Sequence, residues 1–397
     1  MHLTPLFNPR TIAVVGASRD RTKLGNVIFR NCSRFGYTGK VYAVNPKAQR
    51  VEGQRAYPSL AAIPQKVDLV IVVTQAAVVS AVIADAVRAK AKSAMVISAG
   101  FGEVGEKGKA LQEQVVAIAK RGRLLLLGPN CLGIVLPHLK LNASFGAGLP
   151  DVGGVTILSQ SGAIAVAEMD WAAAKHLGFR AIVSLGNKAL LGEAELLEYF
   201  AADPGTKVIL FYLEDIRDDR AFMQVAQRVA SKKPVIVLRA GRSVAAARAA
   251  QSHTGALAGS SAVTDALLRQ AGCIVVDTME EWFNLAAVCS DAPRPKGNRL
   301  AILTNAGGPG ILATDALAGT ALQLAQLTKT SLQKLQRVLP PAASIHNPVD
   351  VMGDAPPERY AAALKILAAD SNIDILALVL TEQLMTRSNA VAKAVIA

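Results

Sequence analysis

Short apolar runs recur along the chain, and each ends in a turn of small or polar residues. The first run, Thr11 to Val15, leads into Gly16-Ala17-Ser18 and then into a helical pattern from Gly25 to Phe35. Consecutive apolar residues are typical of a strand that is buried on both faces of a sheet. The segment therefore predicts a buried strand, a tight turn and a helix, which is how a nucleotide-binding βαβ unit begins.

Further strands are predicted in the first third of the chain, and helical patterns separate them. They lie at Val41–Val44, Val67–Val73, Ser93–Ile97 and Leu124–Leu127. Because an intervening helix returns the chain to the same end of the sheet, these strands should be parallel and the sheet doubly wound. Ligands of such a sheet bind outside the carboxyl ends of its strands, so the turns at that edge are the candidate binding residues.

A second group of strands begins at Val155, after a Gly- and Pro-rich stretch from Pro137 to Gly154 that we interpret as a crossing between domains. Its members are Val155–Leu158, Ala181–Leu185, Lys207–Leu213 and Pro234–Leu238. The first of them ends in Ser159-Gln160-Ser161-Gly162 at the mouth of a helix from Ala163 to Leu177. Free backbone N–H groups at a helix N-terminus favour an anion, so this turn is a candidate phosphate site.

The pattern repeats after a second linker, Ser290 to Asn298. The run from Leu300 to Gly307 matches the run from Val155 to Gly162 at a constant offset of 145 residues. Two related α/β units are therefore expected. We interpret the later unit as incomplete, because only the strand Ile373–Leu380 and one helical pattern follow before the chain stops. We expect domains at residues 1–140, 150–290 and 298–397, the last of them incomplete.

Composition narrows the class of ligand. The formal charge is +13, but lysines and arginines are scattered and aromatic residues make up only 5% of the chain. A nucleic-acid surface needs clustered basic residues with stacking rings, so we expect an anionic small molecule and no nucleic acid. The four cysteines are far apart and show no metal-ligand spacing, which fits a reducing compartment and no metal site. The most apolar stretch, Leu69 to Val87, is interrupted by polar residues, so a cytoplasmic protein without a membrane span is expected.

The turn after the second predicted strand reads Asn45-Pro46-Lys47. Dinucleotide sites usually place an acid there to hold the ribose hydroxyls. A lysine prefers a phosphate, which favours a ligand with a phosphorylated ribose over NAD. The alternative is a plain connection in which Lys47 is solvated.

One histidine, His253, stands in a run of small residues from Ser252 to Ser260, just before a helical pattern. A neutral imidazole is a good nucleophile at pH 7, so this loop is suited to carrying a phosphoryl group. Glu214 follows a predicted strand at the edge where the loop should lie, and a carboxylate there would orient the imidazole. A solvated loop histidine and a solvated or helix-capping glutamate are the alternatives.

Eight short motifs in this order resemble those of the nucleoside-diphosphate-forming acyl-CoA synthetases, the superfamily that includes succinyl-CoA synthetase. They are VVGAS at Val14–Ser18, SAGFGE at Ser98–Glu103, GPNCLG at Gly128–Gly133, SQSGA at Ser159–Ala163, SLGNK at Ser184–Lys188, SHTGALAGS at Ser252–Ser260, NAGGPG at Asn305–Gly310 and NPVDV at Asn347–Val351. The likeness covers nearly the whole chain. It implies a CoA-binding Rossmann-like domain followed by two flavodoxin-like ligase domains.

The resemblance also implies a reaction: acyl-CoA, ADP and phosphate give acid, CoA and ATP through an acyl phosphate and a phosphohistidine. It assigns the phosphohistidine to His253, the acid that steadies it to Glu214, and the phosphate site to Ser159, Gln160, Ser161 and Gly162. For CoA it implies Gly16, Ala17, Ser18, Asn45, Pro46, Lys47, Ser98, Gly100, Phe101, Asn130 and Cys131.

Two departures from the family pattern stand out. Acidic residues are expected after Gly186-Asn187-Lys188-Ala189, but Leu190, Leu191 and Gly192 follow. The ATP-grasp part, which would hold ATP or ADP with Mg²⁺, is absent from this sequence. We therefore expect an ATP-grasp β subunit or C-terminal half as partner, an oligomer, and no ligase activity without that partner.

Two other functions are open. A CoA-sensing regulatory module of a protein acetyltransferase would share the fold but would need neither His253 nor Glu214. An NADP-dependent dehydrogenase is compatible with Lys47, although no convincing hydride-transfer constellation accompanies it.

Overall fold

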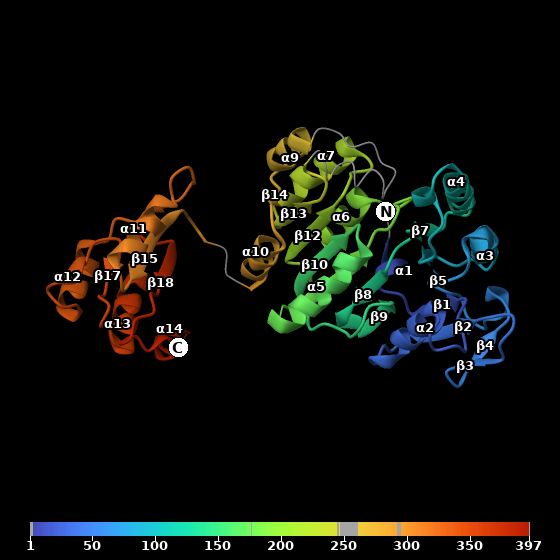
Figure 1. Ribbon diagram of the computed structural model, residues 1–397, viewed down its shortest axis with the longest axis horizontal. Coiled ribbons are helices and arrows are strands. Elements are labelled where there is room, and N and C mark those ends of the chain that lie inside the picture. The colour runs from blue at the N-terminus through green and yellow to red at the C-terminus, as the bar shows by residue number, and fades with distance from the viewer. Residues whose placement is uncertain (1–2, 176, 244–245, 247–260, 292–294, 397) are drawn as a thin grey trace. The chain divides into compact units, whose positions relative to one another are not determined.

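The computed structural model describes residues 3–175, 177–243, 246, 261–291 and 295–396 (Figure 1). The chain forms two compact units, Met1–Ala292 and Pro293–Ala397, which we describe one after the other. Both contain β-sheets with helices, and the main strands of each sheet are parallel. The predicted α/β class is therefore confirmed. Among the helices of the described residues, none has the length and apolar character needed to cross a membrane.

The first sheet of the first unit has seven strands in the order β3-β4-β2-β1-β5-β6-β7. The strands are β1 (Thr11–Val15), β2 (Lys40–Val44), β3 (Arg50–Val51), β4 (Gln54–Tyr57), β5 (Leu69–Val72), β6 (Ser93–Val96) and β7 (Leu125–Leu127). All pairs are parallel except β3 with β4 at the edge. The helices are α1 (Thr4–Phe7), α2 (Leu24–Arg34), α3 (Ala76–Arg88) and α4 (Glu106–Arg121), with 3₁₀ turns at Leu60–Ala62 and Gly102–Val104.

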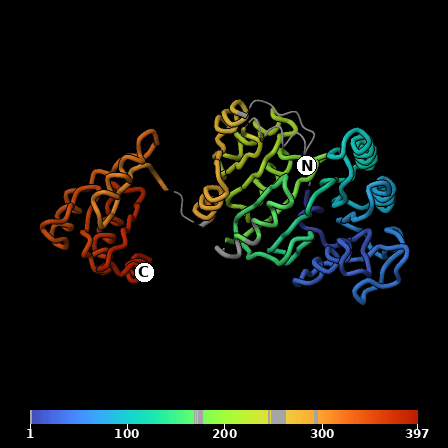
Figure 2. Tube along the Cα trace, in the orientation of Figure 1, coloured from blue at the N-terminus to red at the C-terminus, as the bar shows by residue number. Residues whose placement is uncertain are grey.

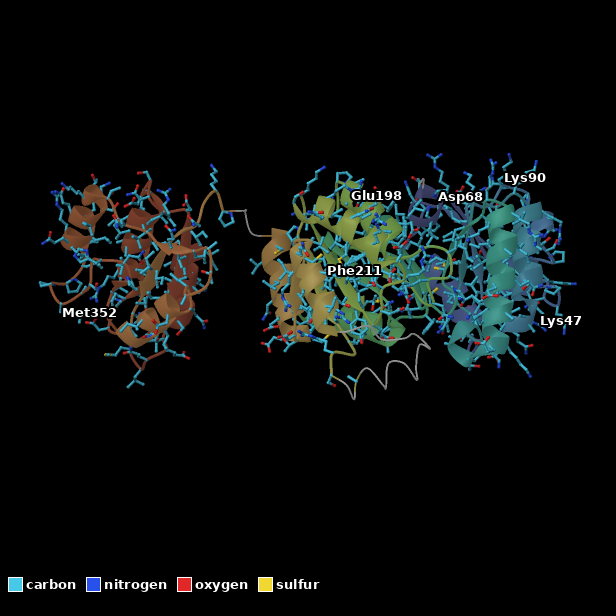
Figure 3. All side chains as sticks on the ribbon, turned by 90° about the horizontal axis from the view of Figure 1, so that it is seen from above. Lys47, Asp68, Lys90, Glu198, Phe211 and Met352 are labelled. Carbon is cyan, nitrogen blue, oxygen red and sulfur yellow. The ribbon has the colours of Figure 1, made fainter. Side chains whose placement is uncertain are left out.

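The second sheet also has seven strands, in the order β14-β13-β12-β10-β11-β8-β9. Its parallel strands are β10 (Val152–Ser159), β11 (Phe179–Ser184), β12 (Val208–Leu213), β13 (Val235–Arg239) and β14 (Ile274–Val276). The helices are α5 (Gly162–Lys175), α6 (Glu193–Ala202), α7 (Asp219–Ala230), α9 (Ser261–Gln270) and α10 (Met279–Asp291). Phe211 lies in the interior of this sheet and is fully buried (Figure 3).

The stretch Pro137–Gly154, which we interpret as a crossing between domains, contains ordered strands. The stretch contains the 3₁₀ turn Pro137–Leu139, all of strand β9 (Leu141–Ser144) and the start of β10. Strand β9 pairs with β8 (Gly133–Leu136), and β8 pairs with β11, both antiparallel. Every residue of the two hairpin strands is buried, whereas Ala147, Gly148, Asp151 and Val152 after the hairpin are exposed.

One of the three apolar clusters in the first unit forms a core that spans both sheets. The hairpin β8–β9 lies against α2, which belongs to the first sheet (Figures 1 and 2). Ile28 and Phe29 of α2 pack in the same buried cluster as Ile134 and Leu141 of the hairpin. Buried Asn31 of α2 donates hydrogen bonds to the carbonyl oxygens of Ser144, at 2.9 Å, and Gly146, at 3.1 Å. Because this core is continuous, the two sheets hold their carboxyl edges in a fixed relation.

The second unit has a small sheet around β15 (Arg299–Thr304). Strands β16 (Gln323–Leu324), β17 (Val349–Asp350) and β18 (Ile375–Val379) all pair with β15 in parallel. The helices are α11 (Gly307–Asp315), α12 (Lys329–Val338), α13 (Pro357–Ala368) and α14 (Ser388–Ile396). Its core is a separate cluster that includes Leu303, Leu335, Tyr360 and Val391.

The internal repeat is visible in atomic detail. Helices α5 and α11 begin at Gly162 and Gly307, the same offset as in the sequence. The Ser159 hydroxyl donates to the carbonyl oxygen of Ser161 at 2.9 Å, and the Thr304 hydroxyl donates to that of Ala306 at 3.0 Å. The two units thus build the same strand–turn–helix junction from different residues.

The turn after β1 depends on a glycine. Gly16 has a φ of +93°, and a Cβ added to it would lie 2.2 Å from the carbonyl oxygen of Val73. Any side chain would therefore push the carboxyl ends of β1 and β5 apart.

We expect Gly16→Ala to destabilise the protein by several kcal/mol. The left-handed conformation costs an alanine about 1–2 kcal/mol, and displacing a backbone carbonyl adds to that cost. Gly53→Ala is the matched control, because Gly53 also has a positive φ, +77°, but no atom lies within 4 Å of its added Cβ. Urea unfolding should show a clearly larger loss for Gly16→Ala. Equal losses in the two variants would contradict this explanation.

Candidate functional site

A cavity of about 890 Å³ lies where the carboxyl ends of the two sheets of the first unit meet. The turns after β1, β2, β5 and β6 contribute Gly16, Asn45, Thr74 and Ser98 to its wall. Ser161 and Gly162, at the start of α5, line the same cavity. The arrangement brings a nucleotide-type turn and a helix N-terminus together, which is suited to a long anionic ligand.

Side-chain hydrogen bonds hold these turns in place. The Asn45 amide donates to the carbonyl oxygen of Ala17 at 2.7 Å, and its oxygen accepts from the backbone N–H of Lys47 at 2.8 Å. The Ser98 hydroxyl donates to the carbonyl oxygen of Thr74 at 2.6 Å. Each polar side chain thereby ties one strand end to its neighbour.

Most of the predicted site residues line this cavity. From the predicted CoA set, the lining residues are Gly16, Ser18, Asn45, Ser98, Asn130 and Cys131, and from the phosphate set Gln160, Ser161 and Gly162. Ala17, Phe101 and Ser159 are fully buried, and Pro46, Lys47 and Gly100 also lie outside the lining. Lys47 is exposed (Figure 3).

Sequence reasoning missed Lys23. This lysine lines the cavity as the residue that precedes α2. It follows the charged run Arg19-Asp20-Arg21, which has the composition of a solvated loop. The signal that could have identified it is its place at the N-terminus of the first βαβ helix, where phosphates bind.

Cys131 lines the cavity as a neutral thiol. Burial raises its pKa to about 12, and its Sγ contacts the carbonyl oxygen of Val96 at 3.3 Å. A thiolate is the nucleophilic form of cysteine, so Cys131 is unsuited to forming a covalent acyl intermediate.

A second cavity, of about 480 Å³, adjoins the first, and Asn130 and Gln160 line both. Glu103, Lys109 and Gln112 contribute to its wall from the first-sheet side, and Asn187, Lys188, Glu214 and Asp215 from the second-sheet side. Glu214 directly follows β12, as the sequence predicted. The side chain predicted to orient a histidine therefore lines a polar cavity.

The Glu214–Asp215 turn is held from two directions. Gln160 accepts hydrogen bonds from the backbone N–H groups of Glu214 and Asp215, and its own amide donates to the Asp215 carboxylate at 2.7 Å. On the other side, the Lys188 ammonium lies 2.7 Å from the Asp215 carboxylate and 2.6 Å from that of Glu193. Glu193 thus supplies a carboxylate after the GNK motif, two residues beyond Leu190-Leu191.

Glu103 links the two sheets across this cavity. Its carboxylate accepts from the Asn187 amide at 2.5 Å and from the backbone N–H groups of Gly100 and Phe101 at 2.6 and 3.1 Å. Burial alone would raise the pKa of Glu103, but these hydrogen bonds outweigh it and lower the pKa below its usual value.

His253 lies outside the described residues, so its predicted pairing with Glu214 stays a prediction. The described residues on either side of that segment are joined by ion pairs. Asp265 of α9 lies 2.7 Å from Arg239 at the end of β13 and 2.9 Å from Arg242. Within the described ranges, no group of three or more His, Cys, Asp or Glu side chains could hold a metal ion.

Three family models match the chain in sequence order. They are a CoA binding domain over residues 10–137, a succinyl-CoA ligase like flavodoxin domain over residues 152–289 and a ligase-CoA domain over residues 300–396.

Curated relatives and solved structures resemble the chain over nearly its whole length. Acetate–CoA ligase [ADP-forming] I of Archaeoglobus fulgidus is 44% identical over 376 residues, which cover 95% of this chain and 54% of the relative. The alpha subunit of acetate–CoA ligase [ADP-forming] II of Pyrococcus furiosus is 42% identical over 93% of this chain and 80% of the relative. The dinucleotide-forming acetyl-coenzyme A synthetase 1 of Ca. Korarchaeum cryptofilum, in complex with phosphate and ADP, matches with a TM-score of 0.95 and 39% identity over 100% of this chain and 85% of that one. The chain therefore spans about half the length of the A. fulgidus relative and most of the alpha subunit.

The lowered pKa of Glu103 predicts an acid-sensitive contact between the sheets. A carboxyl with a depressed folded-state pKa stabilises the fold fully above its unfolded pKa, about 4.3, and loses that contribution as the pH falls through the folded value. The stability advantage of the wild type over Glu103→Gln, measured by urea unfolding, should therefore be present at pH 7 and shrink below about pH 4. Exposed Glu106 of the same cavity is the control, and Glu106→Gln should change stability little. An advantage for Glu103 that grows on acidification would overturn the interpretation.

Proposed function

The chain belongs to the family of ADP-forming acyl-CoA synthetases, and on that premise we propose that it is the CoA-binding, phosphohistidine-bearing part of such an enzyme. The reaction is the conversion of acyl-CoA, ADP and phosphate to a carboxylic acid, CoA and ATP, in either direction. The observation that carries the proposal is the 890 Å³ cavity, which joins the turns of the CoA-binding domain to the N-terminus of α5.

CoA binds in this cavity against the turns at Gly16–Ser18, Asn45 and Ser98. Gly16, Ala17, Ser18 and Ser98 have small side chains, which allow a phosphorylated ligand to approach the backbone closely. Lys23 at the start of α2 supplies a positive charge to the phosphates. Lys47, on the adjoining turn, is proposed to reach the phosphate of the ribose.

The inorganic phosphate binds at the N-terminus of α5. The Ser161 hydroxyl caps this helix by accepting from the backbone N–H of Ile164 at 3.3 Å, and its own proton remains available to an anion. The backbone N–H groups of Gly162 and Ala163 have no partner within the helix, as at every helix start. Phosphate held there would lie in the same cavity as the thioester end of CoA.

Two group transfers follow in the proposed mechanism. A phosphate oxygen attacks the thioester carbonyl carbon, the carbon–sulfur bond breaks, and acyl phosphate and the CoA thiol result. A ring nitrogen of His253 then attacks the phosphorus, the acid leaves as a carboxylate, and the phosphoryl group stays on the histidine. Glu214 accepts a hydrogen bond from the other ring nitrogen, which bears a proton, and stabilises the positive charge that develops on the ring.

The nucleotide step needs a further part. We propose that an ATP-grasp chain or segment binds ADP with Mg²⁺ and receives the phosphoryl group from His253. The name of the P. furiosus relative, an alpha subunit, supports a separate partner chain.

The regulatory and dehydrogenase alternatives have less support. The A. fulgidus and P. furiosus relatives are named as ligases, and two of the matched family models are ligase domains. These likenesses favour the synthetase reaction over a CoA sensor or hydride transfer.

We expect the first unit to bind CoA in preference to NAD. We also expect Lys23 and Lys47 to contribute differently to the affinity for CoA. Loss of one charge-assisted contact costs roughly 1.5–3 kcal/mol, or about 10- to 100-fold in affinity. Calorimetry should show that Lys23→Ala weakens CoA and dephospho-CoA alike, whereas Lys47→Ala weakens CoA only. Equal wild-type affinities for CoA and NAD would refute the assignment. A Lys47→Ala variant that still prefers CoA to dephospho-CoA would remove the proposed role of that lysine alone.

We expect His253 to become phosphorylated by ATP when an ATP-grasp partner is present, with an acid-labile, base-stable linkage. The chain alone should stay unlabelled, and His253→Ala should abolish labelling. Glu214→Gln should slow labelling because a neutral amide stabilises the charged ring less. Glu198→Gln is the control, because Glu198 pairs with Arg228 on an exposed surface (Figure 3). Undiminished label in His253→Ala, measured by mass spectrometry, would disprove the assignment.

A further inference from the structure

A buried lysine lies beside the turn that carries Glu214. The side chain of Lys188 is only 6% exposed, and it contacts Glu193, which is 2% exposed, and Asp215. We propose that Lys188, neutralised by Glu193, is a positioning residue that fixes the Glu214–Asp215 turn and thereby the direction of the Glu214 carboxylate. This inference rests on the proposed function of Glu214.

The backbone directs Lys188 inward. Gly186 and Lys188 have positive φ values of 60° and 52°. A Cβ on Gly186 would lie 2.2 Å from the carbonyl oxygen of Pro129, and the N–H of Asn187 donates to that oxygen at 2.8 Å. A left-handed conformation is unfavourable for a lysine, and the ion pairs of the Lys188 side chain with Glu193 and Asp215 offset that cost.

The charges of Lys188, Glu193 and Asp215 are suited to restraining the Glu214–Asp215 turn. A buried ammonium is costly unless it is paired and its hydrogen-bonding capacity is used. Lys188 donates to the Glu193 carboxylate at 2.6 Å, to the Asp215 carboxylate at 2.7 Å and to the Asp215 carbonyl oxygen at 3.2 Å. Glu193 offsets the buried charge, while the two bonds to Asp215 restrain both the side chain and the backbone of the turn.

The opposite side of the turn is restrained by Gln160, whose amide donates to the carbonyl oxygen of Asp215 at 3.0 Å as well as to its carboxylate. Asp215 therefore accepts hydrogen bonds from the Lys188 ammonium and from the Gln160 amide, and it directly follows Glu214 in the chain. A carboxylate that orients an imidazole must lie within hydrogen-bonding reach, about 2.6–3.2 Å, and a misplacement near 1 Å can cost about 100-fold in rate.

The repeat in the second unit provides an internal comparison. There Asn305, the counterpart of Gln160, exchanges hydrogen bonds of 2.8 Å with the backbone carbonyl and N–H of Thr381. That turn carries a threonine in place of Glu214. In the part of the second unit that the structure describes, the ion pairs are Arg299–Asp374 and Arg359–Asp354, and neither includes Thr381 or its neighbours. A side-chain amide that hydrogen-bonds to the turn is thus common to both units. The Lys188–Glu193 pair lies beside the turn of the first unit, which carries the Glu214 carboxylate.

The test uses the full chain with its ATP-grasp partner. Lys188→Met/Glu193→Gln removes both buried charges together and so avoids an unpaired one. We expect phosphorylation of His253 to slow by about 10- to 100-fold while the KM for CoA stays within about twofold, because only the orientation of Glu214 is lost. The backbone amides of Glu214 and Asp215 should exchange hydrogen faster, as measured by mass spectrometry.

Two further variants separate positioning from general stability. Arg180→Met/Asp203→Asn removes another partly buried pair of the first unit, with a 2.7 Å contact, and should change neither the phosphorylation rate nor exchange at 214–215. Asp215→Ala leaves the Lys188–Glu193 pair intact and should reproduce the loss even if the double variant fails to fold.

Wild-type phosphorylation rates in the folded variants would overturn the proposal, and so would unchanged amide exchange at the turn. An unlabelled wild type would instead refute the proposed function, and the exchange measurement would still decide whether Lys188 restrains the turn.

Discussion

The segment Gly128–Leu132 joins the carboxyl edges of both sheets, and the geometry of both cavities depends on it. Asn130 donates its backbone N–H to Ser98 on the first sheet at 3.0 Å, and the Pro129 carbonyl accepts from Asn187 on the second sheet at 2.8 Å. The N–H of Leu132 donates to the Ser184 hydroxyl at 3.0 Å. Hydrogen bonds of this kind are individually modest, but they are costly to break when buried, so the junction acts as one rigid piece.

In the proposed reaction, this junction holds the CoA-binding domain beside the proposed phosphate site, so that both can act on one thioester. If a flexible linker joined the two sheets, the linker would have to become ordered each time CoA and phosphate met. The conformational entropy lost by the linker would then oppose the reaction. Because the shared core and the hydrogen-bonded junction already fix the two sheets, this entropy is lost on folding and not during the reaction. The same rigidity places the Glu214–Asp215 turn on the wall of the adjoining cavity, where Lys188 and Gln160 hold it.

Periodicity was sufficient to predict most of the parallel strands, because continuous apolar runs such as Ile12–Val14 are buried on both faces, but it missed β4, β14, β16 and β17. It failed for the hairpin β8–β9, where Gly133 and Pro137 have the composition of a loop but serve tight packing and a turn. The turn residues that line the main cavity were predictable because parallel strands place their ends together. Lys23 and Glu193 were not, since each reaches its site from a helix start rather than from a strand end, and only the tertiary structure shows what such a side chain contacts.

The proposed reaction requires CoA and phosphate to meet in one cavity of the first unit. A crystal structure of the chain with CoA and phosphate tests this requirement most directly. We expect the CoA phosphates to lie against Gly16–Ser18 and Lys23, with the thiol end near the phosphate at Ser161 and Gly162. Coenzyme A bound elsewhere, or with its thiol directed away from the N-terminus of α5, would contradict the proposed mechanism.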